Sequence, residues 1–218
     1  MPRPALVYST LHLPRPLEAS TAIALLERLA ADPHATRLVF ELRSGPAGID
    51  YLLGCRPTDV QWLRRLLRQL LPGSALTSLS TPRQPVTSAA KLLIRPAGLA
   101  LRSDTIEAAC RAILAAANQH LATDEAIVLQ VVVGPRSQPT HLRDSASDPR
   151  ISLLDALLGV RRPAGREVRR QLTERSTAAG FHAIIRLAAT GSNPRRRDAF
   201  ISGLLGALAT TRSPGITM

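Results

Sequence analysis

The chain contains an internal repeat, which constrains its architecture before any single residue is considered. Residues 36–76 run through a strand pattern, an Ala-Gly turn, a second strand pattern, a basic amphipathic helix and a Pro-Gly turn. Residues 126–218 contain the same succession, with Ala-Gly at 179–180 and Pro-Gly at 214–215. The second copy also carries a long insert. The repeat predicts two similar units in tandem, and the insert is where a specific function is most readily added.

Each unit is predicted to have an α+β fold of the ferredoxin-like, split βαβ type, with an antiparallel sheet and helices on one face. The first unit covers residues 1–80 with the order βαββαβ. A Ser/Thr/Pro-rich linker over 81–90 leads to a second βαββα unit over 91–218, with its insertion at about 135–178. Because the second unit ends where a last strand is due, we expect a fragment of a longer protein.

Hydrophobic spacing and capping residues define the individual elements. Strands are predicted at 5–13, 36–44, 48–55, 75–80, 91–102, 126–134 and 180–190, and helices at 17–31, 57–71, 104–121, 151–160, 166–177 and 194–209. Helix N-caps are expected at Thr58, Asp104 and Asn193. The strand at 126–134 is nearly all apolar, which predicts a central strand covered on both faces.

The positive charge is concentrated late in the chain. The net charge is +12, and Lys91 is the only lysine among 28 basic residues. Residues 161–198 hold ten arginines and three acidic residues, a net charge of +7. GC-rich coding is one explanation for the arginines. The other is attraction of an anionic partner such as nucleic acid, an acidic protein face or acidic lipid.

Cysteine usage and apolar runs indicate a cytoplasmic protein. Cys55 and Cys110 lie in apolar segments without metal-like spacing, so we expect both to be buried in a protein of a reducing compartment. The N-terminus has no apolar stretch typical of a signal peptide. The longest apolar run, 126–133, is too short to cross a bilayer. We expect no transmembrane segment, and contact with the inner face of the membrane only through partners.

Motifs for catalysis are missing from the sequence. It has no G-x-x-x-x-G-K-[ST] loop for nucleotide phosphates and no G-x-S-x-G turn. No two of the five histidines lie within four residues of each other, which predicts no metal site. Asp124 and Glu125 form a carboxylate pair at a turn, where we expect solvation rather than acid–base chemistry. The prediction is a non-catalytic protein without cofactor or metal.

Nine arginines are the candidate contacts for an anion, a nucleic acid or a protein partner. They are Arg161, Arg162, Arg166, Arg169, Arg170, Arg175, Arg195, Arg196 and Arg197. The last three lie in the first turn of a helix, where each exposed cation opposes the helix dipole by about 0.3–1 kcal/mol. This position favours an external anion, with a solvated charge run as the alternative. The aromatic pattern of RNA-binding sheets is missing, so the expected mode is phosphate-backbone contact.

Several segments in succession resemble one protein family. They are Leu-His-Leu-Pro-Arg-Pro (11–16), Leu-Val-Phe-Glu-Leu-Arg (38–43), Gly-Ile-Asp-Tyr-Leu-Leu-Gly (48–54), a basic helix with Leu-Pro-Gly (71–73), and Gly-Phe-x-x-x-Ile-Arg (180–186). Together they resemble the N-terminal region of actinobacterial coupling-type ATPases, the TraG/TraD-like and HerA-like proteins of type IV secretion and conjugation. The resemblance covers residues 5–212, and its motifs are loose patterns of strand, turn and helix.

In that family a RecA-like motor with a Walker A loop follows, assembles as a hexamer and pumps DNA. The resemblance therefore implies a non-catalytic accessory or assembly module. Its expected partners are the motor domain in cis, DNA, and secretion-system or relaxosome proteins, with self-association as a further expectation. No catalytic residue of the family has a counterpart in this sequence.

Two other functions remain open at this stage. A stand-alone nucleic-acid-binding protein would use its arginine-rich insert and bind less tightly as salt increases. A small α+β enzyme would need an acid–base constellation in a deep pocket, and the sequence offers none.

Overall fold

The computed structural model describes residues 5–32, 37–95, 101–139, 148–149, 165–177, 179–214 and 216–218. Within these residues the fold is α+β, with one antiparallel sheet. The strands are β1 (Val7–His12), β2 (Leu38–Gly45), β3 (Gly48–Cys55), β4 (Ala75–Ser78), β5 (Ser88–Lys91), β6 (Ala126–Ser137) and β7 (Gly180–Thr190). The helices are α1 (Ala19–Ala31), α2 (Val60–Leu70), α3 (Ile106–Ala117), α5 (Arg166–Thr177) and α6 (Pro194–Ala209), with a 3-10 turn, η1 (Pro57–Asp59), before α2.

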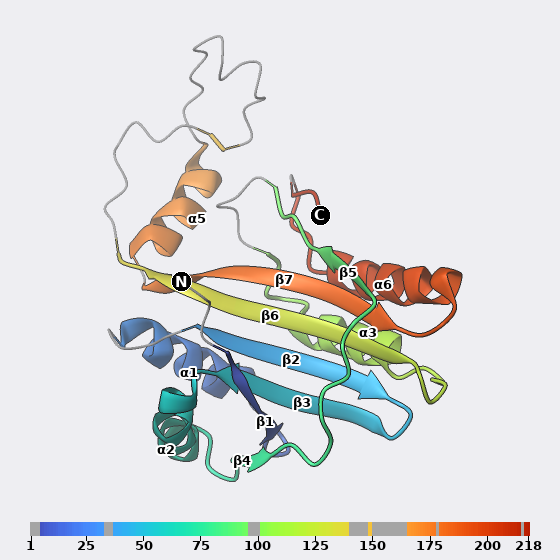
Figure 1. The fold of residues 1–218 in the computed structure, drawn as a ribbon. Coiled ribbons are helices and arrows are strands. Elements are labelled where there is room, and N and C mark those ends of the chain that lie inside the picture. The colour runs from blue at the N-terminus through green and yellow to red at the C-terminus, as the bar shows by residue number, and fades with distance from the viewer. Residues whose placement is uncertain are drawn as a thin grey trace.

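Both halves of the chain contribute to a single continuous sheet (Figure 1). Its strand order is β4-β1-β3-β2-β6-β7-β5. The halves meet where β2 pairs with β6, from Leu38 opposite Val133 to Ser44 opposite Ile127. On its other side β6 pairs with β7. The predicted central position of the strand at 126–134 is therefore confirmed.

Each half places its strands in the same spatial order. The first half reads β4-β1-β3-β2 from its edge, and the second reads β5-β7-β6 from the opposite edge. An isolated bridge joins Thr217 to Arg95, beyond the end of β5. In the first half, Ala75 pairs with His12 at the end of β1. Ala75 and Thr217 both lie two residues after a Pro-Gly pair. The bridge therefore occupies the place where β4 begins in the first half.

Helices α1, α2, α3 and α6 pack against one face of the sheet through two aliphatic clusters. One cluster joins α1 and α2 to the first-half strands, with Leu29, Leu63 and Leu53 fully buried. The other joins α6 to β6 and β7, with Leu204 and Ile127 fully buried. Burial of about 1.5–3 kcal/mol per large aliphatic side chain makes these clusters the main source of stability.

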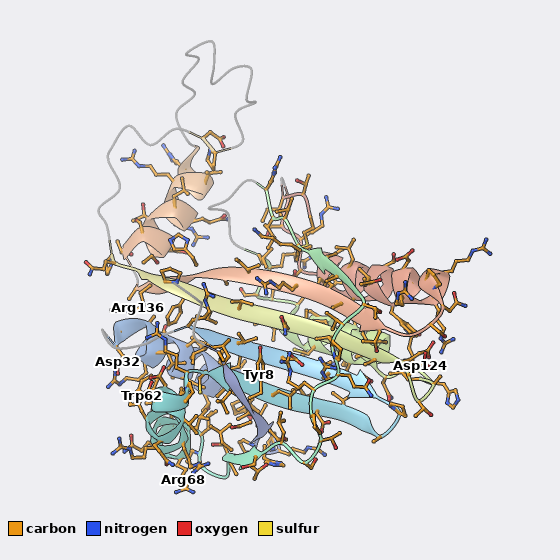
Figure 2. All side chains as sticks on the ribbon, in the orientation of Figure 1. Tyr8, Asp32, Trp62, Arg68, Asp124 and Arg136 are labelled. Atoms are coloured by element: carbon orange, nitrogen blue, oxygen red, sulfur yellow. The ribbon has the colours of Figure 1, made fainter. Side chains whose placement is uncertain are left out.

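Arg136 fastens the far end of β6 to α1 (Figure 2). Its Nε donates a hydrogen bond of 2.5 Å to the carbonyl of Ala30, and its Nη2 donates one of 3.3 Å to the carbonyl of Ala31. These carbonyls end helix α1 and have no partner within it, so a cation there also complements the helix dipole.

Residues 79–87, here called the crossing segment, run over the opposite face of the sheet. They lead from β4 at one edge to β5 at the other (Figure 1). This segment was expected as part of a linker over 81–90. Strand β5 begins at Ser88, inside the expected linker, and not at residue 91. Its Ser-Ala-Ala sequence has little intrinsic strand preference, and the strand depends on pairing with β7.

Two of the three predicted N-caps are wrong. Helix α2 begins after the 3-10 turn, and the Thr58 hydroxyl donates to the Asp59 carboxylate. Asp104 accepts two hydrogen bonds from Arg102, and no side chain caps α3. Thr58 and Asp104 do not cap their helices because Thr58 bonds to the Asp59 carboxylate and Asp104 is paired with Arg102. The cap at Asn193 is confirmed, since its side chain accepts from the backbone N–H of Arg196.

Some helices bury fewer residues than their predicted apolar stripes contain. Cys110, expected to be buried, is exposed on α3. Leu26, Leu114 and Leu205 are exposed as well. Each of these helices lies on the surface of the sheet and buries only the edge that faces it, so apolar side chains at the margin of the stripe remain in water.

Within the insert, the helix predicted at 166–177 is confirmed as α5. Strand β6 extends beyond the predicted end at 134 to Ser137, after a register shift between Val133 and Arg136. Val168 of α5 is buried against Ile216, near the C-terminal end of the chain. The predicted helix at 151–160 lies outside the described residues.

Candidate functional site

The nine predicted contact arginines divide into three groups. Arg161 and Arg162 lie outside the described residues, and so does the side chain of Arg175 on α5. Arg166, Arg169 and Arg170 are exposed on α5, where Arg170 pairs with Glu174 at 3.8 Å, and Arg195 is exposed at the start of α6. Arg196 and Arg197, also at the start of α6, make contacts within the protein.

Arg196 joins the first turn of α6 to the turn before β6. Its Nε forms an ion pair of 2.5 Å with Glu125, and its Nη2 donates to the carbonyl of His120 at 2.6 Å. The guanidinium also lies 5.0 Å from the centre of the Phe200 ring. Arg196 therefore has a structural role that the sequence did not indicate.

Glu125 is buried, although solvation was expected for the Asp124–Glu125 pair. Its carboxylate accepts a hydrogen bond of 2.9 Å from the backbone N–H of Ala122, as well as the contact from Arg196. The Ala122 hydrogen bond and the Arg196 contact outweigh burial and hold the pKa of Glu125 below its ordinary value. The expectation of a solvated pair is wrong for Glu125, because its partner is 71 residues away in sequence and invisible to local patterns.

Arg197 fastens α6 to the sheet. Its Nε donates to the hydroxyl of Ser88 at 2.9 Å, and its Nη1 donates to the carbonyl of Gly191 at 2.6 Å. These contacts join β5, the end of β7 and α6. Arg195 and Arg196 are both exposed, and Arg196 is already paired with Glu125, so an external anion at this helix end would meet Arg195 first.

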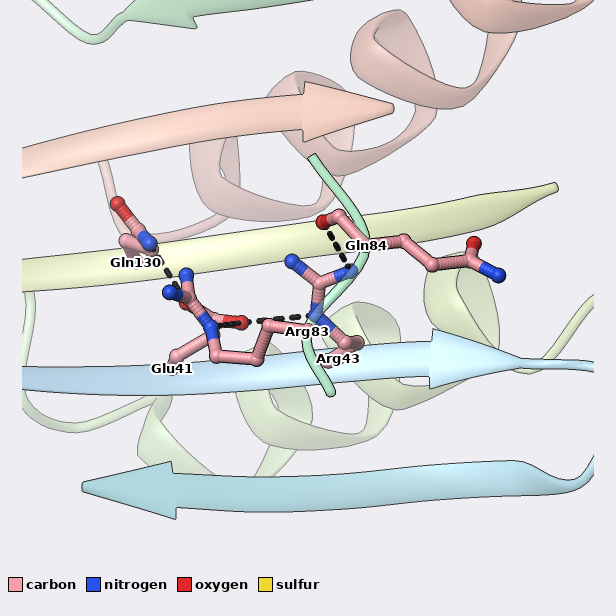
Figure 3. Close-up of polar contacts among 5 residues, drawn as sticks. All are labelled: Glu41, Arg43, Arg83, Gln84 and Gln130. Carbon is pink, nitrogen blue, oxygen red and sulfur yellow. Dashed lines mark hydrogen bonds and ion pairs between the residues drawn. The ribbon is translucent and has the colours of Figure 1, made fainter. Parts of the chain in front are cut away.

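A polar cluster that the sequence analysis missed lies on the face of the sheet covered by the crossing segment (Figure 3). Its centre is Glu41 on β2, whose side chain is 0% exposed. Arg83 of the crossing segment donates to both carboxylate oxygens, at 3.2 and 2.6 Å. Arg43 donates at 2.9 Å, and Gln130 of β6 donates at 2.6 Å. The carboxylate is thus held by three side chains from three segments.

The ionised form of Glu41 is favoured despite its burial. Burial alone would raise the pKa of Glu41, but the hydrogen bonds from Arg83, Gln130 and Arg43 outweigh it, and the pKa lies below its ordinary value. A charged, fully hydrogen-bonded carboxylate is the state in which such a group can stay buried.

Arg83 also stacks on Tyr8 of β1. Its guanidinium carbon lies 3.6 Å from the centre of the ring. Tyr8 in turn lies over Gly54, where a Cβ atom would be 2.7 Å from the ring. Burial raises the pKa of Tyr8, while the charge of Arg83 acts in the opposite direction. The ring covers one face of the Arg83 guanidinium, and the Glu41 carboxylate binds its edge.

A pocket of about 280 Å³ lies beside this cluster, between the crossing segment and strands β6 and β7. Arg43 contributes to its wall, and its Nη1 donates to the carbonyl of Gln84 at 3.1 Å. Arg83, Gln130 and Arg186 also line it. The strand register places these polar groups in one row, with Glu41 opposite Gln130, Gln130 opposite Arg186, and Arg186 opposite Lys91.

One signal of this row is present in the sequence. Glu41 and Gln130 are the single polar residues within the apolar runs 38–42 and 126–133. A polar residue in a strand that is covered on both faces needs a hydrogen-bonding partner. The identity of the partners depends on the register and on the path of the crossing segment, neither of which the sequence indicates.

No group of three or more His, Cys, Asp or Glu side chains in the described residues could hold a metal ion. The same residues include no helix with the length and hydropathy of a membrane span. Comparison of the chain with protein-family models, with curated proteins and with solved structures found no match.

Proposed function

We propose that this chain is a non-catalytic accessory module of a DNA-translocating, conjugation-type ATPase, built from two tandem ferredoxin-like units. The strand orders β4-β1-β3-β2 and β5-β7-β6 support such units, because a split βαβ arrangement places its first strand beside its third. The module contacts the motor domain, DNA or a secretion partner and contributes no catalytic group.

The segments that resemble the coupling ATPases support this assignment by their positions. Residues 38–43 lie in β2, 48–54 in β3 and 180–186 in β7. None of these three strands is at an edge of the sheet, and each pairs with neighbours on both sides. The resemblance therefore involves the segments that determine the fold.

The observation that carries the proposal is the basic surface of α5. Arg166, Arg169 and Arg170 are exposed on this helix, while Val168 anchors it beneath. An exposed basic helix that is anchored by a buried side chain is suited to contact an acidic protein surface or a phosphate backbone. The insert that carries α5 is the main difference between the two halves of the chain.

The test begins with the coding sequence after residue 218 and continues with binding. We expect a Walker A motor to be encoded there. When the motor and the tagged chain are expressed as separate polypeptides, the motor should co-purify with the chain through affinity and size-exclusion columns. The triple variant R166Q/R169Q/R170Q should reduce the co-purified amount. Its control is R56Q/R65Q/R68Q, which removes the same charge from exposed positions of the first half. A reading frame that ends at residue 218 with no motor gene beside it would overturn the proposal.

A second candidate function is stand-alone binding of nucleic acid through the same helix. The exposed arginines of α5 favour it independently of any motor. Anisotropy titrations with fluorescent duplex and single-stranded DNA would show an affinity that falls steeply between about 50 and 200 mM salt. Absence of binding at the lower concentration would exclude this function, and retention of binding by R166Q/R169Q/R170Q would assign it to another surface.

A further inference from the structure

We propose that the pocket between the crossing segment and strands β6 and β7 binds a phosphate group through Arg43, Arg83 and Arg186. This site goes beyond the proposed function, which places the partner contacts on α5. The two are independent, because the pocket is formed by the sheet and the crossing segment.

The charge balance of the pocket is the first argument. Arg43 and Arg83 share one carboxylate, Glu41, so two guanidinium charges are opposed by one negative charge. Arg186 adds a third positive charge to the wall, and no acidic side chain among the described residues lines the pocket. Asp50 lies opposite Arg43 in the register and lines a neighbouring pocket with Arg43 and Arg83, but it does not line this one. The excess charge favours an anion with more than one negative charge.

Burial makes this excess significant. The side chains of Arg43 and Arg83 are only 13% and 26% exposed. Water therefore compensates their charge poorly, and an anion in the pocket would replace the missing solvation. Val86, Val128 and Ala188 supply apolar wall, which lowers the local dielectric constant and strengthens such an interaction.

Unused donors point to the same ligand. Arg83 uses Nε and Nη2 on Glu41, and Arg43 uses Nε and Nη1 on Glu41 and Gln84. Toward the described residues, the remaining Nη of each, and the guanidinium of Arg186, make no hydrogen bond. Planar guanidinium groups match the oxygen atoms of phosphate, so three of them around one cavity define a phosphate site rather than a halide site.

The size of the pocket limits the ligand. Pockets for small molecules usually measure about 300–1,000 Å³, and this one measures about 280 Å³. It suits inorganic phosphate or pyrophosphate, or one phosphodiester group of a nucleic-acid strand whose remainder lies outside.

Isothermal titration of the full chain with pyrophosphate, at low ionic strength in phosphate-free buffer, tests the site. We expect saturable binding that Arg186→Gln weakens at least about tenfold, the effect of losing about 1.4 kcal/mol. Arg65→Gln is the matched control, because it removes one exposed arginine from α2 on the other side of the sheet. Its affinity should stay within about twofold of the unmodified chain.

Urea unfolding of both variants shows whether the sheet stays intact, and Arg186→Gln is expected to leave the midpoint unchanged. Absence of saturable binding, or equal weakening by both substitutions, would overturn the proposal.

Competition then identifies the source of the phosphate. If pyrophosphate displaces a labelled single-stranded oligonucleotide from the protein, and Arg186→Gln binds this oligonucleotide weakly, the ligand is a nucleic-acid backbone. If the oligonucleotide stays bound to the protein in the presence of pyrophosphate, the ligand is a free phosphate. A defect confined to R166Q/R169Q/R170Q concerns the proposed function alone.

Discussion

The Glu41 carboxylate on β2 accepts two hydrogen bonds from Arg83, 42 residues further along the chain. This contact attaches the crossing segment to the face of the sheet opposite helices α1, α2, α3 and α6 (Figure 1). It also joins the halves, because Gln130 of β6 donates to the same carboxylate. A single buried charge therefore couples the β2–β6 junction to the path of the connection between the two halves.

Replacement of Glu41 should be strongly destabilising. In Glu41→Gln, two largely buried guanidinium groups lose their carboxylate, and breaking a buried ion pair in this way costs about 3 kcal/mol. Urea unfolding followed by circular dichroism measures the loss. Glu107→Gln is the control, because the Glu107–Arg111 pair is exposed and should contribute less than about 0.5 kcal/mol. Equal effects of the two substitutions would show that the buried cluster adds no stability.

Replacement of Arg83 should act locally. In Arg83→Gln, Glu41 keeps Arg43 and Gln130, so the sheet remains folded. The crossing segment loses both its ion pair and its stacking on Tyr8. Hydrogen–deuterium exchange should therefore become faster at residues 79–87, while exchange in β2 and β6 stays slow. Unchanged exchange in the crossing segment would mean that other contacts hold it in place.

The stability of the protein should fall in acid partly through Glu41. The pKa of this carboxyl in the folded state lies below its ordinary value of 4.5. Between these two values the unfolded chain binds more protons, so folding stability is present above the ordinary pKa and decreases as the pH falls toward the folded one. The difference in unfolding free energy between the unmodified chain and Glu41→Gln should stay constant well above pH 4.5 and shrink as the pH falls through 4.5 toward the folded pKa. Glu125 is present in both proteins, so its contribution cancels. A constant difference would contradict the assignment.

Local patterns predicted the elements whose ends carry strong signals. Strands β3 and β7 both begin at the glycine of an Ala-Gly pair, and their bounds at 48–55 and 180–190 agree with the prediction. Helix α6 begins as expected because Asn193 caps it and Pro194 occupies its first position, where the missing N–H of proline costs no hydrogen bond. Strand β5 was misplaced because its sequence carries no such signal and its pairing with β7 decides where it lies.

The candidate sites could be predicted only in part, because the sequence does not distinguish an arginine that is available to a partner from one that makes contacts within the fold. Arg195 and Arg196 are neighbours and both are exposed, yet Arg196 is paired with the buried Glu125. The Glu41 cluster brings together residues 42 and 89 positions apart. Such contacts depend on the tertiary fold and on the sheet register, which no local periodicity contains.

The adjacent arginines of α6 provide a direct test of that distinction. Arg196→Gln removes the ion pair with Glu125 and the hydrogen bond to the His120 carbonyl, so it should destabilise the protein by about 1–3 kcal/mol. Arg195→Gln removes the same charge from an exposed side chain and should change stability by less than about 0.5 kcal/mol. Urea unfolding of both variants provides the measurement. The opposite ranking would mean that the internal contacts of Arg196 add nothing.

The two cysteines should differ sharply in reactivity. Cys110 is exposed on α3, whereas Cys55 is buried at the end of β3. Burial, with a smaller effect of the Asp59 charge, raises the pKa of the Cys55 thiol to about 11. Since the thiolate is the reactive form, Cys55 should be inert at neutral pH in the folded protein. Titration with a chromogenic disulfide reagent should therefore detect one thiol in the native chain and two in urea. Cys110→Ser should abolish the fast reaction, and rapid labelling that persists in this variant would show that Cys55 is accessible and that the packing of β3 against α2 is loose.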